Sequence, residues 1–315
     1  MPAQIDKNRA LGCLTGQLAG DTLGALVKFK TPGQIQAAYP NGVRKMEAGG
    51  SFGIAAGQPT DDSEMALALA YSLARLKKYD PAAVRNSYKN WLLSGPFDIS
   101  RTIANALNGT FESGSQSNGA IMRVSPLAIF CARPEVTNDQ ITNWARLDCR
   151  LTHTGEMCQD ANVVFVRTIA LAIRTGLDRK KVVSSARETV KSVKLDPAVK
   201  QAVRDGCDGI RPKSYTVNPS WVVIALQNAF YQLAKAPNPE EAIVDTLVQG
   251  GDTDTNAAVA GALLGAACGA EAFPEDWRKT LAECRPSIDD PKVPHHRPRL
   301  YWPADALNLI KDLIS

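Results

Sequence analysis

The sequence predicts an all-α protein, and three observations support this fold class. Apolar residues recur at helical spacing along most of the 315-residue chain. Typical helix-start and helix-end residues, such as Asp80-Pro81 and Gly109, separate the apolar stretches. Alternating strand patterns are nearly absent, since the best local candidate, residues 221–224, continues into a helical pattern. Neither a fixed repeat nor a flexible linker interrupts the chain, so we expect one compact domain over residues 1–315.

The expected elements follow in chain order. The first helix begins after Asp6 and carries glycines at four-residue intervals from Gly12 to Gly24, which share one face and let another backbone approach. Residues 111–119, mostly Gly, Ser, Gln and Asn, form a loop, and residues 286–303, rich in proline, form an extended surface segment. The expected helices span residues 6–29, 60–79, 81–93, 98–108, 137–152, 157–174, 178–192, 197–205, 220–235, 239–248, 255–269 and 302–314.

The composition is typical of a globular protein in water and excludes several classes. Hydrophobic residues make up 44% of the chain and charged residues 22%, unlike disordered or collagen-like sequences. The formal net charge of +4 comes from 36 basic and 32 acidic residues that are scattered, so we expect no nucleic-acid partner. The most apolar window, residues 257–270, is too short to span a membrane. The seven cysteines are widely spaced and no signal-peptide pattern is found, which favours reduced thiols and a cytoplasmic location.

Two acidic clusters lie where expected helices begin, at residues 60–64 and 250–256. Each cluster alone is explained by helix capping, because an aspartate at a helix N-terminus accepts hydrogen bonds from free N–H groups. Together they offer four aspartates and several hydroxyls, which are the hard oxygen ligands that Mg²⁺, Mn²⁺ or Ca²⁺ prefer. The chain has three histidines and no thiol cluster, so we do not expect a zinc site.

Three known acidic motifs fit these clusters poorly. Asp252 and Asp254 resemble the start of a phosphatase Asp-x-Asp-x-Thr motif, but Asn256 stands where that motif needs Thr or Val. A helix, rather than the buried strand of that motif, is also expected before them. Neither cluster has the spacing of an EF-hand loop. The Asp-rich motifs of isoprenoid synthases lie inside a helix, whereas Asp61 and Asp62 stand at a helix start.

Five motifs occur in order along the chain: residues 20–24 (Gly-Asp-Thr-Leu-Gly), 60–63 (Thr-Asp-Asp-Ser), 117–127 (Ser-Asn-Gly-Ala-Ile-Met-Arg-Val-Ser-Pro-Leu), 151–154 (Leu-Thr-His-Thr) and 250–255 (Gly-Gly-Asp-Thr-Asp-Thr). With these motifs, the chain resembles the ADP-ribosylglycohydrolase family, the group of the dinitrogenase-reductase-activating glycohydrolase and the arginine ADP-ribosylhydrolases. The resemblance covers nearly the whole chain. It implies an orthogonal all-α bundle with a binuclear magnesium centre in a cleft.

By this resemblance the protein is an enzyme that hydrolyses the glycosidic bond between ADP-ribose and a modified protein side chain, most often arginine. Its partners would be ADP-ribosylated proteins or ADP-ribose, with no nucleic acid and no membrane. The same resemblance implies two Mg²⁺ ions, which Mn²⁺ can replace, and assigns Asp61 and Asp62 to water activation or proton transfer. The implied metal ligands are Thr60, Asp61, Asp62, Asp252, Asp254 and Thr255.

The resemblance also implies a set of substrate contacts. Loop residues 117–119 would offer backbone N–H groups to the diphosphate of ADP-ribose. Arg123 either adds positive charge to this region or is a structural ion-pair partner. His153 either lines the cleft or is a buried structural histidine. The residues assigned to substrate binding are Asp21, Lys28, Ser117, Asn118, Gly119, Arg123 and His153.

One position departs from the family pattern Gly-Asp-x-x-Gly-x-x-x-Glu, because this chain has Lys28 in place of the glutamate. In the family that glutamate lies over the cleft, where it contacts the substrate ribose or gates access. Three alternatives remain open: Lys28 is a solvated surface residue, it contacts an anionic part of a different substrate, or it weakens metal or substrate binding. The last would make the protein a catalytically impaired ADP-ribose-binding or partner-blocking protein, which is the alternative to the hydrolase.

Overall fold

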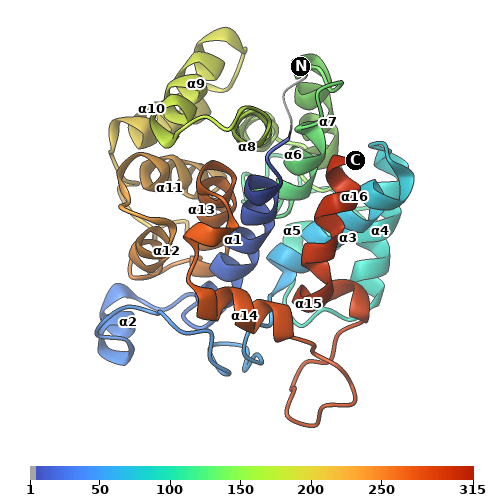
Figure 1. Cartoon of the computed structure of the whole chain (residues 1–315), viewed down its shortest axis with the longest axis vertical. Helices are drawn as coiled ribbons and strands as arrows, with labels where there is room; N and C mark the ends of the chain where they lie inside the picture. The colour runs from blue at the N-terminus through green and yellow to red at the C-terminus, as the bar shows by residue number, and fades with distance from the viewer. Residues whose placement is uncertain (1–4) are drawn as a thin grey trace.

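The computed structural model describes residues 5–315, and within them the all-α prediction is confirmed. Helices α1 and α13 cross the centre of the molecule side by side, and the other helices surround them (Figure 1). The described residues form no strand, only two isolated bridges, Gly49 with Ile54 and Ser117 with Trp221. The α-helices are α1 (Lys7–Ala25), α2 (Pro32–Ala38), α3 (Asp61–Leu76), α4 (Pro81–Leu93), α5 (Arg101–Leu107), α6 (Ser125–Cys131), α7 (Asn138–Arg150), α8 (Glu156–Thr175), α9 (Arg179–Ser192), α10 (Pro197–Asp208), α11 (Val222–Lys235), α12 (Pro239–Leu247), α13 (Thr253–Cys268), α14 (Glu275–Glu283), α15 (Pro303–Ala306) and α16 (Ile310–Ile314).

Glycines allow α1 and α13 to pack with their backbones in direct contact. A Cβ atom placed on Gly16 would overlap the carbonyl group of Gly261, and one placed on Gly261 would overlap that of Gly16. The close approach that the glycine spacing predicts is therefore confirmed, and the approaching helix is α13. Gly24 lies in the same way against the backbone of Asp254, so this contact brings α1 against the acidic start of α13.

Capping hydrogen bonds explain several helix starts that the sequence predicts. The carboxylate of Asp6 accepts the backbone N–H of Arg9 at the start of α1. The carboxylate of Asp80 accepts the backbone N–H groups of Ala82 and Ala83 at the start of α4. Each cap replaces a hydrogen bond that the first turn of a helix cannot make internally, which fixes where the helix begins.

The helices differ from the prediction in three places. Helix α1 ends at Ala25 instead of near Phe29, which adopts a left-handed backbone with φ of 59°. Helices α2, α6 and α14 have no counterpart in the prediction, although α2 starts with a capping box at Thr31 and has Pro32 in its first turn. The helix expected at 302–314 is divided into α15 and α16 by a 3-10 turn.

The proline-rich segment 286–303 lies along α3 and is anchored there by a buried ion pair. The Nε and Nη2 atoms of Arg297 donate hydrogen bonds to the two carboxylate oxygens of Glu64, at 2.7 and 2.8 Å. The indole N–H of Trp91 donates to the same carboxylate at 2.8 Å. Glu64 belongs to the first turn of α3, so the anchor lies next to the first acidic cluster.

All seven cysteines are unpaired in the structure, and six of them are buried. This agrees with the expectation of reduced thiols. In residues 5–315, no helix is both long enough and apolar enough to cross a membrane.

Candidate active site

The structure brings the two acidic clusters together at one small cavity. The first turns of α3 and α13 form one wall, which includes Asp61, Asp62 and Asp252. The opposite wall comes from residues 98–100 and from the polar loop at 117–119. The cavity has a volume of about 170 Å³.

Asp21 lies beneath this cavity and holds the first acidic turn in place. Its Oδ1 accepts hydrogen bonds from the backbone N–H and the hydroxyl of Thr60, at 3.0 and 2.8 Å. Its Oδ2 accepts the backbone N–H of Ser63 at 3.0 Å. Asp21 is fully buried and does not line the cavity. In this structure it therefore positions the start of α3.

Asp252 is fixed by two segments on the opposite wall. Its Oδ2 accepts hydrogen bonds from Asn118 Nδ2 at 2.8 Å and from Ser220 Oγ at 2.7 Å. The two segments are themselves paired, because the backbone N–H of Asn118 donates to Ser220 O and that of Val222 donates to Gln116 O, both at 2.9 Å. This backbone pairing holds the polar loop over the start of α13.

Four carboxylate oxygens at the centre of the site are buried and accept no hydrogen bond: Asp61 Oδ1, Asp62 Oδ1, Asp252 Oδ1 and Asp254 Oδ2. The last of these already has a cationic neighbour, because the ammonium of Lys28 lies 2.8 Å from Asp254 Oδ2. Burial raises the pKa of Asp61, Asp62 and Asp254 well above the usual range, and neighbouring carboxylates raise it further. Oxygens of Asp21, Asp62 and Asp254 lie within 4.8 Å of one another. Because buried polar atoms are normally satisfied, these oxygens are suited to binding a cation.

The chemistry of the donor set fits a hard divalent cation. Thr60 and Thr255 are buried among the carboxylates, and the hydroxyl proton of Thr60 is directed at Asp21, which leaves oxygen lone pairs free. Neither histidine nor cysteine lines the cavity. Oxygen-only donors favour Mg²⁺, Mn²⁺ or Ca²⁺ over Zn²⁺.

Lys28 reaches into the same site from the turn that follows α1. Its ammonium donates a hydrogen bond of 2.7 Å to Asp98 Oδ2 and forms an ion pair of 2.8 Å with Asp254 Oδ2. The side chain is 9% exposed, so Lys28 is not the solvated surface residue of the first alternative. Burial alone would lower the pKa of Lys28, but the charges of Asp254 and Asp252 raise it well above its usual value. The group therefore stays charged.

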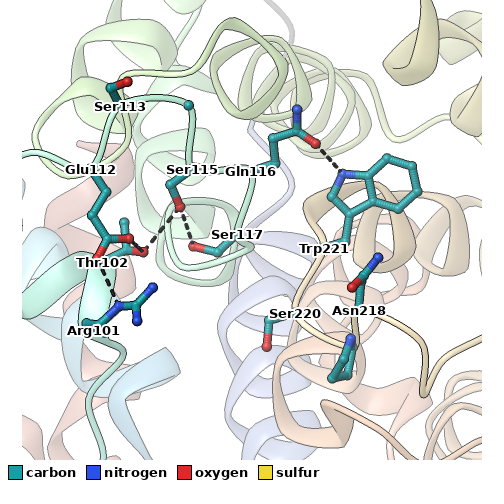
Figure 2. A pocket seen from close by; sticks show the side chains of 12 residues that line it. Arg101, Thr102, Glu112, Ser113, Ser115, Gln116, Ser117, Asn218, Ser220 and Trp221 are labelled. Atoms are coloured by element: carbon teal, nitrogen blue, oxygen red, sulfur yellow. Dashed lines mark hydrogen bonds and ion pairs between the residues drawn. The ribbon is translucent and has the colours of Figure 1, made fainter.

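A second and larger pocket, of about 510 Å³, adjoins the acidic cavity (Figure 2). Ser117 and Ser220 line both spaces. Arg101 and the polar loop form one side of the larger pocket. Trp221 forms the other, and its indole N–H donates to the side-chain oxygen of Gln116 at 2.9 Å. The two spaces are therefore neighbours, and the acidic clusters line the smaller one.

Arg123 and His153 lie behind the cavity and do not line it. Arg123 is fully buried, where it donates to Thr152 Oγ1 at 2.7 Å and pairs with Asp148 at 3.4 Å. His153 is also fully buried, with Nε2 2.7 Å from Ser117 Oγ and Nδ1 2.8 Å from Thr152 Oγ1. Burial and the charge of Arg123 lower the pKa of His153 to about 3, so the ring is neutral. In this structure both side chains support the loop from behind.

Three residues of the site are absent from the sequence prediction: Asp98, Ser220 and Trp221. Asp98 was expected only as the start of a helix, but Ser100 caps α5 instead, and Asp98 is left to bind Lys28. Ser220 stands at a predicted helix start, where a serine is normally explained as a cap. The polar residues just before α11 are the one sequence signal that could have identified Ser220 and its neighbour as part of the site.

Several known proteins that are similar to this chain are described as ADP-ribosyl hydrolases. The family described as ADP-ribosylglycohydrolase matches residues 2–305. The ADP-ribosyl-[dinitrogen reductase] glycohydrolase of Rhodospirillum rubrum is 30% identical over 287 residues, which cover 87% of this chain and 90% of that protein. The ADP-ribosylarginine hydrolase Tri1 of Pseudomonas putida is 28% identical, over 87% of this chain and 74% of that protein.

A solved structure has the same overall fold. It is described as an ADP-ribosylglycohydrolase-related protein complex, and it aligns with a TM-score of 0.75 at 27% sequence identity. The alignment covers 96% of this chain and 97% of that chain.

Proposed function

Because the chain belongs to the ADP-ribosylglycohydrolase family, we propose that this hydrolase is Mg²⁺-dependent and releases ADP-ribose from modified arginine side chains of proteins. The observation that carries the proposal is the group of buried carboxylate oxygens that accept no hydrogen bond, on Asp61, Asp62 and Asp252, at the 170 Å³ cavity. Two similar proteins are named for ADP-ribosylated dinitrogen reductase and for ADP-ribosylarginine, which supports a protein-linked substrate and favours arginine.

Two adjoining spaces suit a substrate with two halves, such as ADP-ribose. The larger pocket would take the adenosine and diphosphate, where Arg101 and the loop backbone can meet the phosphate charge. The inner cavity would take the second ribose, with its anomeric carbon beside Asp61 and Asp62. Ser117 and Ser220, which line both spaces, would mark the border between the two halves of the ligand.

The proposed reaction breaks the bond between the anomeric carbon of ribose and the side-chain nitrogen, through an oxocarbenium-like transition state. Either Asp61 or Asp62 would take a proton from the attacking water, since both carboxylates line the cavity. Burial raises the pKa of each, which suits a group that accepts a proton near neutral pH. The neutral His153 and the buried Arg123 would keep Ser117 in place beneath the substrate.

The metal would be held by the six residues that the family resemblance implies. A bound divalent ion would lower the pKa of its water and orient the ribose hydroxyls. We propose Mg²⁺ with Mn²⁺ as a substitute, because every donor is an oxygen. These ligands would be Thr60, Asp61, Asp62, Asp252, Asp254 and Thr255.

The test is release of ADP-ribose from two synthetic peptides, one modified on arginine and one on serine. Chelator-treated protein should be inactive, and millimolar Mg²⁺ or Mn²⁺ should restore release from the arginine-linked peptide. Asp254→Asn should abolish the restored activity, whereas Asp139→Asn, an exposed aspartate in the first turn of α7, should not. Release from neither peptide with either metal would reject the proposal, and release from the serine-linked peptide alone would correct the linkage.

One observation favours a second candidate function on the same fold. Lys28 places a positive charge among the carboxylates that should bind metal. A protein impaired in this way would bind ADP-ribose without hydrolysing its conjugates, or block a partner. Calorimetric binding of ADP-ribose, together with no release from either peptide after long incubation, would support this candidate over the hydrolase.

A further inference from the structure

We propose that the ammonium group of Lys28 occupies the position of one divalent ion, so that this chain binds one metal ion where the family resemblance implies two. The proposal rests on the metal centre of the proposed function and specifies its composition. It begins from the one motif position at which this sequence reverses the charge of the family pattern.

The ammonium lies within the acidic centre itself. Its Nζ atom is 2.7 Å from Asp98 Oδ2, 2.8 Å from Asp254 Oδ2 and 4.0 Å from Asp252 Oδ1. A metal ion bound to Asp252 and Asp254 would need oxygens at about 2.0–2.6 Å on the same side. An ammonium that is already in contact with Asp254 Oδ2 leaves no space there for such an ion. Two adjacent cations would also repel each other strongly in a buried site.

Packing holds Lys28 in this position as firmly as charge does. Its ammonium lies 5.5 Å from the ring centres of both Phe29 and Phe52, within the range of cation–π attraction. Two hydrogen bonds hold the backbone that follows the Lys28 side chain. Ser51 Oγ donates to Lys28 O at 3.0 Å, and the N–H of Phe29 donates to Gly251 O at 2.7 Å. Displacing the ammonium would break its ion pairs with Asp98 and Asp254 and its contacts with the two rings.

The part of the acidic centre formed by Asp61 and Asp62 can still bind one divalent ion. Asp61 Oδ1 and Asp62 Oδ1 have no hydrogen-bond partner, and in residues 5–315 Lys28 forms ion pairs only with Asp98, Asp252 and Asp254. A divalent ion held by Asp61 and Asp62 would therefore not compete with the ammonium for its three carboxylates. Three positive charges, two from the ion and one from Lys28, would then offset most of the negative charge of Asp61, Asp62, Asp252 and Asp254.

The replacement changes what the site can do. An ammonium carries one charge and donates hydrogen bonds, whereas a divalent ion accepts several oxygen ligands and lowers the pKa of bound water. Water activation in this chain would depend on the single ion held beside Asp61 and Asp62. Lys28 would instead donate a hydrogen bond to a hydroxyl or phosphate oxygen of the substrate.

The test counts the metal ions bound by each protein molecule. Chelator-stripped protein is titrated with Mn²⁺, the free ion is followed by its paramagnetic resonance signal, and the bound ion by elemental analysis. Wild type should bind one Mn²⁺. Lys28→Met and Lys28→Glu should bind two, and the resonance spectrum should broaden because two Mn²⁺ ions lie close together. Lys30→Met is the matched control, since it makes the same charge change two residues away and should still bind one.

Each other count has a defined meaning. Two ions in wild type would overturn the inference, because the ammonium would then move aside. One ion in both Lys28 variants would also overturn it, because removal of the ammonium would open no second position. No binding by wild type would reject both the inference and the metal centre. Circular dichroism shows whether the variants are folded, and if they are not, the wild-type count decides alone.

Peptide hydrolysis on the same preparations separates this inference from the proposed function. Release of ADP-ribose by wild type that holds two ions would keep the proposed function and reject the inference. One bound ion without release from the arginine- or serine-linked peptide would keep the inference and reject the proposed function.

Discussion

Asp21 and Thr60 connect the central helix pair to the acidic cavity, through hydrogen bonds of 3.0 Å to the backbone N–H and 2.8 Å to the hydroxyl of Thr60. Asp21 stands between Gly20 and Gly24, whose lack of side chains lets α13 approach α1 on one side. Its carboxylate meets the start of α3 on the other. One segment of α1 thus sets the relative positions of both acidic turns.

Asp21→Ala should destabilise the protein markedly. The change leaves the N–H and hydroxyl of Thr60 and the N–H of Ser63 buried without an acceptor, at a cost of about 1–3 kcal/mol for each group. Asp21→Asn keeps one acceptor oxygen and should lose less. Urea unfolding in the presence of chelator measures both differences. Equal stability of wild type and Asp21→Ala would show that water or a shifted α3 replaces these bonds.

Gly16→Ala should also lower the free energy of unfolding, because the new methyl group would overlap the carbonyl of Gly261. Overpacking of this kind typically costs about 1–3 kcal/mol and occasionally more. Gly33→Ala is the control, since Gly33 lies in α2 with open space around it. That change should be neutral or stabilising by up to about 1 kcal/mol. Thermal unfolding of the two variants should therefore shift in different directions or by clearly different amounts.

The parts of the fold that the sequence predicts correctly depend on local signals. Caps such as Asp6 and Asp80 act within one helical turn, so their positions fix helix starts without tertiary contacts. The glycine spacing of α1 also predicts a close backbone neighbour, but nothing in it identifies α13. The prediction misses α2, α6 and α14, and their length alone does not explain this, because α5 and α12 are equally short and are predicted.

The sequence predicts the parts of the site that belong to a recognisable motif. It does not predict the contacts that only tertiary packing brings about. The two acidic turns are visible in the sequence, and their joint use follows from the family resemblance. The contact between Lys28 and Asp98 is not visible, because the two residues are 70 positions apart in segments with no shared motif. For Arg123 and His153 the sequence leaves two roles open, and only their complete burial distinguishes between them.

Asp61→Asn and Asp62→Asn should each lower turnover of the arginine-linked peptide by about a hundredfold or more, the usual scale for a positioned proton-transfer group. Both variants should stay folded, because each removes one charge from a group of like charges that burial already disfavours. Initial rates at saturating Mg²⁺ measure the effect, with Asp139→Asn as the exposed control. Wild-type rates in both variants would assign the chemistry to other residues.

His153 should make stability fall as the pH is lowered. Its pKa is about 3 in the folded protein, because burial and Arg123 disfavour its charged form, against about 6.5 when unfolded. Below pH 6.5 the unfolded chain therefore binds a proton that the folded chain does not, so stability decreases by up to about 1.4 kcal/mol per pH unit towards pH 3. The measurement is the unfolding free energy of wild type minus that of His153→Asn between pH 7 and 4.5.

Taking this difference removes the contribution of the acidic residues, which both proteins share. The buried aspartates have raised pKa values and act in the opposite direction, since the folded state keeps their protons more strongly as the pH falls. Parallel curves for wild type and His153→Asn would show that the histidine titrates normally in the folded protein. The buried position beside Arg123 would then be incorrect for the protein in solution.

Lys28→Glu should raise hydrolysis of the arginine-linked peptide by about tenfold, which corresponds to ~1.4 kcal/mol of transition-state stabilisation. The change removes the ammonium from Asp98 and Asp254 and supplies an acceptor for a ribose hydroxyl. Lys28→Ala removes the charge without supplying the acceptor, so its gain should be smaller. Rates are compared at fixed ionic strength, because salt screens charge effects at the cavity mouth, and Lys30→Glu serves as the control for net charge. If Lys, Ala and Glu at position 28 gave the same rate and substrate affinity, the reversed charge would have no part in the reaction.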